Sequence, residues 1–336
     1  GSRRDVSPRA SARARSPTAS PSVKPLPACS RRSSPPTSSS TGYSKMVLAS
    51  ALCSAAMRME TVASKSSKAP QNKVALAYAL FLALAGAVFH FVADGEFSAI
   101  MTMSVMFQCL AMLLLCLQSS SSGSSAGISA RALAMEALAL CCRLSSTALY
   151  NGYLPVDASG DWIFQATDVC TLFLTLGLLH RVLVTERASY QEEEDSLPIL
   201  PMVIASFALA ALLHADMNSR PFFDTMWMAG LFVGVLAVLP QLWLVSQTGG
   251  RIQALTSHFI AMLAFSRVLS GIFMWHARQD ITCAPWTGDF NHASWAVLAA
   301  HFLHLCLLGD FAYYYGKNLV TKGLGACVEV SAMDVV

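Results

Sequence analysis

The stretch "AVLPQLWLVSQTGGRIQALTSHF", residues 237–259, interrupts a long apolar segment with Pro240 and Gln241 before it reaches a polar loop. A bilayer disfavours a side-chain amide, and a proline inside a helix removes a backbone hydrogen bond. We therefore interpret Pro240 and Gln241 as a bend in a membrane helix. The proline frees a carbonyl group there, and the glutamine can satisfy the freed backbone groups.

The composition around this stretch is that of a membrane protein. The chain has 336 residues, of which 54% are hydrophobic and 13% are charged, whereas a soluble domain has about 25% charged residues. So little charge cannot cover a globular surface of this size. The ten cysteines form no Cys-x-x-Cys pair and no Cys/His spacing typical of a metal site, so we expect neither a metal nor a cofactor. Without a nucleophile–base pair or a phosphate-binding loop, we do not expect an enzyme.

The charges are unevenly distributed. Residues 1–72 carry twelve Lys or Arg and two acids in a Ser/Pro/Arg-rich sequence. Such a segment buries too little apolar surface to fold, so we predict a disordered basic tail, with a transit peptide as the alternative. No folded basic face accompanies these arginines, so we expect no nucleic-acid partner.

Eight segments are long and apolar enough to be candidate membrane helices. They are about 74–93, 97–117, 128–150, 162–183, 197–214, 221–245, 253–276 and 291–315. The first two are separated by the acidic turn "DGE" and should form a hairpin. Basic residues gather in the connections 118–127, 185–195 and 246–252 and at the C-terminal end, while acids dominate the opposite set. The positive-inside rule therefore places both chain ends in the cytosol.

A weak internal repeat relates residues 124–150 to residues 248–273. Each has a Gly/Ser/Thr break followed by an arginine two turns into a helix, in "RLSS" at Arg143 and "RVLS" at Arg267. We therefore predict an all-α membrane protein. Its seven-helix SWEET-like core consists of two parallel three-helix repeats, preceded by one extra N-terminal transmembrane helix.

Ionisable residues at membrane depth mark candidate sites, because burying a charge in a bilayer is costly. Arg143 has no acid within one turn on its lumenal side, so another helix or a ligand must supply its anion. We favour the ligand, although Asp168 is a possible partner. Asp224 and Trp227 are three residues apart on one helix face and suit a primary ammonium group.

The remaining candidates admit structural roles. Arg267 could bind a ligand or neutralise a buried acid such as Asp310. His301 and His304 share a helix face and suit helix linking better than proton transfer. We interpret Arg131 and Glu136 as groups that solvate a helix end.

The opening stretch resembles the signature of the ER lumen protein-retaining receptors, which bind C-terminal Lys/His-Asp-Glu-Leu tails. The resemblance runs from about residue 100 to 321 and includes "SAGIS" (125–129), "SY" (189–190), "PFFDTMW" (221–227) and "GDFAYYYGKNLVTK" (309–322). The family is related to the PQ-loop and SWEET transporters, which accounts for Pro240 and Gln241. The resemblance implies that His258, in the same signature, has a structural or gating role with them.

The resemblance also implies a ligand site. An arginine at position 143 would hold the terminal carboxylate of the tail, and Asp224 and Trp227 would hold its basic first residue. We assign Arg267, Arg278 and Asp310 to the same site. The resemblance also implies the partners of this chain: lumenal protein tails, the lipid bilayer and, on the cytosolic side, the COPI coat. It implies a location in ER and cis-Golgi membranes.

The sequence departs from the family at several of its functional positions. Met101 stands in place of an arginine, and Gln108 in place of a histidine that is linked to pH sensing. Ser266 and Ser270 replace tyrosines, Gly234 replaces a glutamate, and Ala277 replaces an arginine that Arg278 follows. Only Lys317 and Lys322 remain of a lysine-rich coat signal.

These observations predict four parts: a tail (1–72), an extra helix and turn (73–95), a receptor core (96–321) and a cytosolic C-terminal tail (322–336). The predicted function is retrieval of lumenal proteins from the Golgi to the ER. Two alternatives remain, a PQ-loop/SWEET-like carrier of small solutes and a scaffold that acts through the acidic loop 185–195.

Overall fold

The computed structural model describes residues 71–91, 97, 99–150, 154, 162–216, 220–248, 251–252, 254–283, 290–322 and 328–329. The chain divides into two units, Gly1–Met59 and Glu60–Val336, and all described residues belong to the second. The predicted disordered tail, apart from Gln71 and Asn72, lies outside the described residues. So do the acidic turn 94–96 and most of the predicted C-terminal tail.

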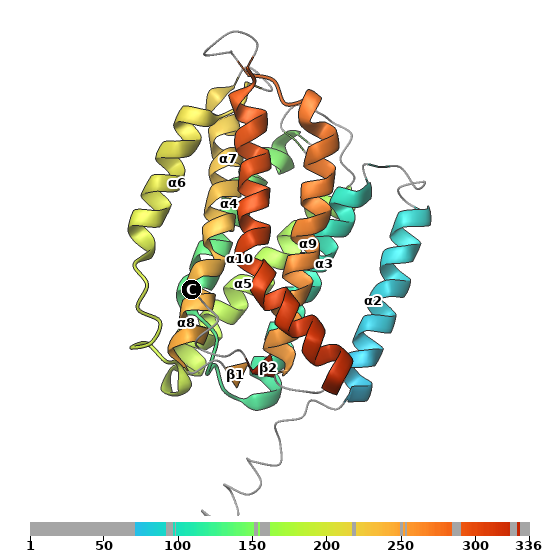
Figure 1. Ribbon diagram of the computed structural model, residues 1–336, viewed down its shortest axis with the longest axis vertical. Helices are drawn as coiled ribbons and strands as arrows, with labels where there is room; N and C mark the ends of the chain where they lie inside the picture. Colours follow the sequence, from blue (N-terminus) through green and yellow to red (C-terminus); the bar gives the residue numbers. More distant parts are fainter. Residues whose placement is uncertain are drawn as a thin grey trace, which may run out of the picture. The chain divides into compact units, whose positions relative to one another are not determined.

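Each of the eight predicted membrane segments is helical, as Figure 1 shows. The helices are α2 (Gln71–Phe91), α3 (Ala99–Ser122), α4 (Ala130–Tyr150), α5 (Trp162–His180), α6 (Ile199–Leu213), α7 (Pro221–Leu236), α8 (Val238–Gln247), α9 (Ala254–His276) and α10 (His292–Lys322). A π-helical turn, Arg181–Thr185, extends α5, and short 3₁₀ turns occupy Arg187–Ser189 and Ala277–Gln279. The described part is therefore almost entirely helical.

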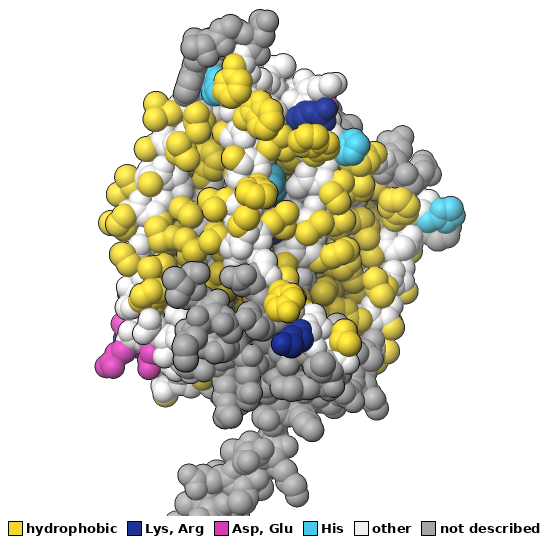
Figure 2. Space-filling model, viewed as in Figure 1, with side chains coloured by type: hydrophobic (Ala, Val, Ile, Leu, Met, Phe, Trp, Pro, Cys, Tyr) yellow, Lys and Arg dark blue, Asp and Glu magenta, His cyan; other side chains and the backbone are white. Residues whose placement is uncertain are grey.

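Five helical segments are long and apolar enough to cross a membrane: Ala99–Ser122, Trp162–Thr185, Pro221–Gln247, Thr256–Gln279 and His292–Gly309. Shorter apolar stretches occupy Tyr78–His90 and Ile199–Leu213. The face in Figure 2 is dominated by hydrophobic side chains, with charged groups mostly near its margins. Exposed Phe173, Leu212 and Phe302 are typical of the side chains that such a surface presents to lipid. The chain is thus a multi-pass membrane protein.

The helices pack in a regular pattern. α5 packs against both α3 and α4, and α10 packs against both α7 and α9. The most extensive contacts cross between these groups, because α3 packs along α9 and α4 packs along α7. α6 lies against the outer side of α7, and α2 lies beside α3 at the edge of the helices in Figure 1.

The helix that contains the opening stretch is divided where the sequence predicts a bend. α7 ends at Leu236 and α8 begins at Val238, four and two residues before Pro240. Proline has no N–H group to bond to the carbonyl of Leu236, four residues earlier. After α8 the chain forms a two-residue strand, β1 (Arg251–Ile252), which pairs antiparallel with β2 (Val328–Glu329).

Candidate functional site

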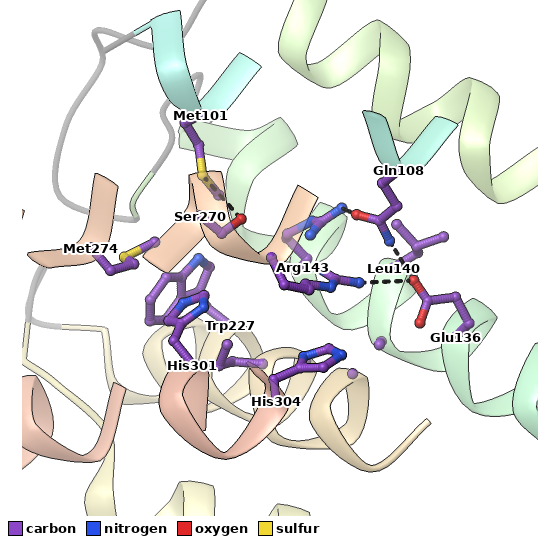
Figure 3. A pocket seen from close by; sticks show the side chains of 15 residues that line it. Met101, Gln108, Glu136, Leu140, Arg143, Trp227, Ser270, Met274, His301 and His304 are labelled. Carbon is purple, nitrogen blue, oxygen red and sulfur yellow. Dashed lines mark hydrogen bonds and ion pairs between the residues drawn. The ribbon is translucent and has the colours of Figure 1, made fainter. Parts of the chain in front are cut away.

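A polar cavity lies where five helices converge. Its lining comes from α3, α4, α7, α9 and α10: Met101, Gln108, Glu136, Ala139, Leu140, Arg143, Trp227, Gly230, Leu231, Gly234, Arg267, Ser270, Met274, His301 and His304. Figure 3 shows Met101 and Met274 toward one end, and Gln108 and Glu136 toward the other. The cavity therefore changes from thioether and indole groups to charged and amide groups along its length.

Arg143 contributes a positive charge to the cavity but is paired with an acid from a neighbouring helix. Its Nε and Nη2 atoms donate to the two carboxylate oxygens of Asp168 on α5, at 2.7 and 2.5 Å. Nη2 also donates to Oε1 of Gln108 at 3.3 Å. The hypothesis that Arg143 has no protein counter-ion is therefore wrong. Asp168 is its partner and is fully buried.

This pairing leaves part of the guanidinium available. The side chain of Arg143 is 16% exposed, and its Nη1 group has no hydrogen-bond partner among the described residues. A guanidinium has five N–H donors, of which the contacts above use three. Arg143 can therefore donate from Nη1 to a second anion while Asp168 fixes the orientation of the guanidinium.

The second arginine, Arg267 on α9, is paired with Glu136 on α4. Its Nη2 atom lies 3.3 Å from Oε1 of Glu136, and Nε2 of Gln108 donates to the same oxygen. Glu136 is only 5% exposed. The interpretation of Glu136 as a group that solvates a helix end is therefore wrong, and Arg267 has Glu136 as a counter-ion.

These contacts form one chain of polar groups across four helices: Asp168, Arg143, Gln108, Glu136 and Arg267. Sequence reasoning missed Glu136 and treated Gln108 only as a departure from the family. A signal for Glu136 was present, because it precedes Arg143 by two helical turns and thus shares its face.

His301 and His304 on α10 form the opposite wall of the cavity (Figure 3). Both are buried. Neither ring nitrogen of His301, nor Nε2 of His304, has a hydrogen-bond partner among the described residues. Their common face agrees with the helical spacing, but no contact of these nitrogens links them to another described helix.

The other predicted ligand residues are distributed differently. Trp227 lines the cavity, whereas the buried Asp224 lies one turn earlier in α7 and is not part of the lining. Arg278 lies outside the cavity, where its guanidinium stacks on Trp275 at 4.6 Å from the ring centre. Asp310 lies in α10, but its side chain is outside the described part of the chain.

Three serines join α3 to α9 beside the cavity. The hydroxyl of Ser104 donates to the carbonyl of Ser266 at 2.8 Å and lies 2.7 Å from the hydroxyl of Ser270. Both α9 serines occupy positions where the family has tyrosines. Small hydroxyl groups here allow close helix packing in a bilayer.

Three of the signature segments quoted above, which contain Gln241, Ser125 and Ser189, meet through hydrogen bonds. Gln241 donates from Nε2 to the carbonyl of Gly127 at 2.9 Å and accepts a hydrogen bond from the N–H of Ser129 at 3.0 Å. Ser189 accepts from the N–H of Ser125 at 2.9 Å. Gln241 therefore satisfies backbone groups of the loop before α4, whereas the expectation was that it satisfies those freed by Pro240.

Asp195 completes this cluster, which we call the loop clamp (Ser125, Gly127, Ser129, Ser189, Tyr190, Asp195 and Gln241). Its fully buried carboxylate accepts from Ser129 Oγ at 2.8 Å and from Tyr190 OH at 2.7 Å. Burial, followed by the hydrogen bond to Asp195, raises the pKa of Tyr190 above its ordinary value. The phenol therefore stays a neutral donor at physiological pH.

His258, the third predicted structural residue, lies between α2 and α10. Its Nδ1 atom is 3.0 Å from the hydroxyl of Tyr78 on α2 and 2.6 Å from that of Tyr315 on α10. Phe81 of α2 also packs edge-on against Phe107 of α3, with ring centres 4.7 Å apart. The extra N-terminal helix is thus attached to the core by polar and aromatic contacts, and its Ala85 and Val88 pack with Met106 of α3.

The cavity is small for the ligand that the sequence predicts. Its volume is about 50 Å³, whereas pockets for drug-sized ligands have volumes of about 300–1,000 Å³. It can hold one or two water molecules. A bound peptide would therefore require the surrounding helices to separate.

Comparisons with known proteins agree with the signature. The family described as ER lumen protein retaining receptor matches residues 124–278. The chain is 26% identical over 211 residues to an ER lumen protein-retaining receptor of Dictyostelium discoideum, covering 62% of this chain and 88% of that protein. It is 28% identical over 221 residues to the receptor erd-2.2 of Caenorhabditis elegans, covering 64% and 92%. A Drosophila melanogaster receptor is 25% identical over 210 residues, covering 61% and 87%.

Proposed function

We propose that this chain, which belongs to the ER lumen protein-retaining receptor family, binds the C-terminal tails of lumenal proteins. It returns these proteins from the Golgi to the ER. The receptor is not an enzyme, and as a multi-pass membrane protein of the secretory pathway it would work in ER and cis-Golgi membranes. The comparisons do not favour the alternative of a small-solute carrier.

The observation that carries this proposal is the position of Arg143. Its guanidinium lines the cavity, is oriented by Asp168 and Gln108, and keeps Nη1 free of described partners. An arginine held in this way suits a carboxylate, because its planar donors match two oxygens. Trp227, farther along the lining, offers an indole face to the basic first residue of a tail.

Helix packing supports the repeat architecture. We infer two three-helix units, α3–α4–α5 and α7/α8–α9–α10, with α6 between them. In each unit the third helix packs against the first two, and the first helix of each packs along the second of the other. Arg143 and Arg267 then occupy corresponding helices, α4 and α9, on the wall of one cavity. This is the arrangement expected of parallel repeats with a site between them.

Binding of the purified protein to tail peptides tests the proposal. Peptides that end in Lys-Asp-Glu-Leu or His-Asp-Glu-Leu would be compared with the same peptides amidated at the C-terminus, by isothermal titration at pH 5.5 and 7.4. We expect the free acids to bind and amidation to weaken binding about tenfold or more. Amidation removes the negative charge of the terminal carboxylate, which is the group that Arg143 would bind. Equal binding of acid and amide would refute the role of Arg143.

Matched variants sharpen this test. Arg143→Gln should abolish the preference for the free acid, whereas Arg278→Gln should keep it, because Arg278 lies outside the cavity. Equal affinities at the two pH values would refute proton-coupled retrieval. That result is compatible with the non-titrating Gln108 at the family's histidine position. The COPI coat is the proposed cytosolic partner and is tested separately, by recruitment to full-length chain in vesicles.

A further inference from the structure

Glu136 places a negative charge inside the cavity. It is 5% exposed, lines the cavity from α4, and its Oε1 atom contacts both Gln108 and Arg267 (Figure 3). A carboxylate this buried requires a cation or several donors to offset its lost hydration. Arg267 and Gln108 supply both.

The charges at the cavity therefore balance in pairs. Arg143 is matched by Asp168, and Arg267 is matched by Glu136. No further Lys or Arg occurs among the described residues that line the cavity. A ligand carboxylate that enters beside Arg267 would meet Glu136 as well, and a like charge at close range disfavours the ionised form of both acids.

The two arginines thus differ in what they offer. Asp168 lies behind Arg143, outside the lining, so the free Nη1 group of Arg143 can meet a terminal carboxylate. Glu136 is part of the lining itself, on the same surface as Arg267. An acidic side chain in the middle of a tail would share the single guanidinium of Arg267 with Glu136, which leaves two buried carboxylates beside one cation.

We propose that Glu136 determines which tails this receptor accepts, selecting those with a free C-terminal carboxylate and uncharged residues in the middle positions. This inference rests on the proposed function, because it assumes that a C-terminal tail occupies the cavity. The receptor would then bind a tail of the type Lys-Asn-Gln-Leu more tightly than Lys-Asp-Glu-Leu. These two sequences have nearly the same shape and differ in charge.

The test compares these two tails on the wild type, Glu136→Gln and Glu186→Gln. Measurements would be made by isothermal titration on the full chain, at whichever of pH 5.5 and 7.4 the wild type binds more tightly. Glu186 is a matched control, because it pairs with Arg181 and Ser119 outside the cavity. Glu136→Gln should shift the affinity ratio toward the acidic tail about tenfold or more, because Arg267 is then free to pair with it. Glu186→Gln should leave the ratio unchanged.

The possible results separate the two proposals. If Glu136→Gln changes the ratio of the two tail affinities by less than about twofold, the role of Glu136 is overturned, even if tails bind. If Glu136→Gln does not fold, the wild type decides. Tighter binding of Lys-Asp-Glu-Leu overturns the inference, and tighter binding of Lys-Asn-Gln-Leu supports it. Failure of the wild type to distinguish any free-acid tail from its amidated form removes the proposed function itself.

Discussion

Arg143 on α4 and Asp168 on α5 are joined by two hydrogen bonds, from Nε at 2.7 Å and from Nη2 at 2.5 Å. The acid is fully buried and the arginine partly exposed to the cavity. This two-point contact restrains the rotation of the guanidinium, which a single contact would not. The contact thus positions the guanidinium that we propose binds the carboxylate of the ligand.

Removing one partner of this pair should be more harmful than removing both charges. Arg143→Gln leaves the carboxylate of Asp168 buried without a cation, which costs about 3–5 kcal/mol of stability. We expect Asp168→Asn to be destabilising as well, and the double variant to be less unstable than the sum of the two. A double-mutant cycle from thermal unfolding in detergent should give a coupling of about 1–3 kcal/mol. Additive effects would show that the pair does not act as a unit.

Gly230 should not tolerate a side chain. A Cβ atom there would lie 2.9 Å from the carbonyl oxygen of Ala139 and 3.1 Å from the nitrogen of Arg143, both in the backbone of α4. Gly230→Ala should therefore push α7 from α4 and lower stability by about 1–3 kcal/mol. Gly234 is the control, because its added Cβ would meet Ala139 Cβ at an ordinary 3.7 Å. Thermal unfolding should show a loss for the first variant only, and equal losses would contradict the close approach.

The eight helices were predictable because a bilayer demands long apolar segments whatever their partners. The pairs inside the cavity were not, because they depend on how each helix is rotated about its axis. Glu136 lies six residues after the start of α4, which suggests exposure near a helix end. In the structure Glu136 instead lines the cavity, where it pairs with Arg267 of α9. The signature residues identified the family, but their mutual contacts in the clamp could not be read from sequence spacing.

Ser104 should matter more than an ordinary serine in a membrane helix. Its hydroxyl contacts Ser266 and Ser270, so it joins α3 to α9. Ser104→Ala should cost about 1 kcal/mol, and because Ser270 lines the cavity it should also alter tail affinity. Ser145 is a suitable control, since among the described residues its hydroxyl bonds only to the carbonyl of Cys142 in its own helix. An unfolding temperature equal for Ser104→Ala and Ser145→Ala would argue against an interhelical role.

Gln241 should be required for the conformation of the loop before α4. Gln241→Ala removes the side-chain donor to the carbonyl of Gly127 and the side-chain acceptor for the N–H of Ser129. Leaving such groups unpaired costs about 1–3 kcal/mol each. Gln241→Glu should be at least as harmful as Gln241→Ala, because it buries a carboxylate that faces the carbonyl oxygen of Gly127. Gln247 on the same helix is exposed, and Gln247→Ala should have no effect.

Hydrogen exchange over residues 123–129, together with thermal unfolding, measures this prediction. Faster exchange in Gln241→Ala than in Gln247→Ala is expected, because the amide of Ser129 loses its acceptor. Gly127 has a positive φ of 80°, which only glycine adopts readily, so the loop has a defined turn that Gln241 holds closed. Unchanged exchange in Gln241→Ala would mean that the turn is stable by itself, and the glutamine would then have to be explained by something other than the loop clamp.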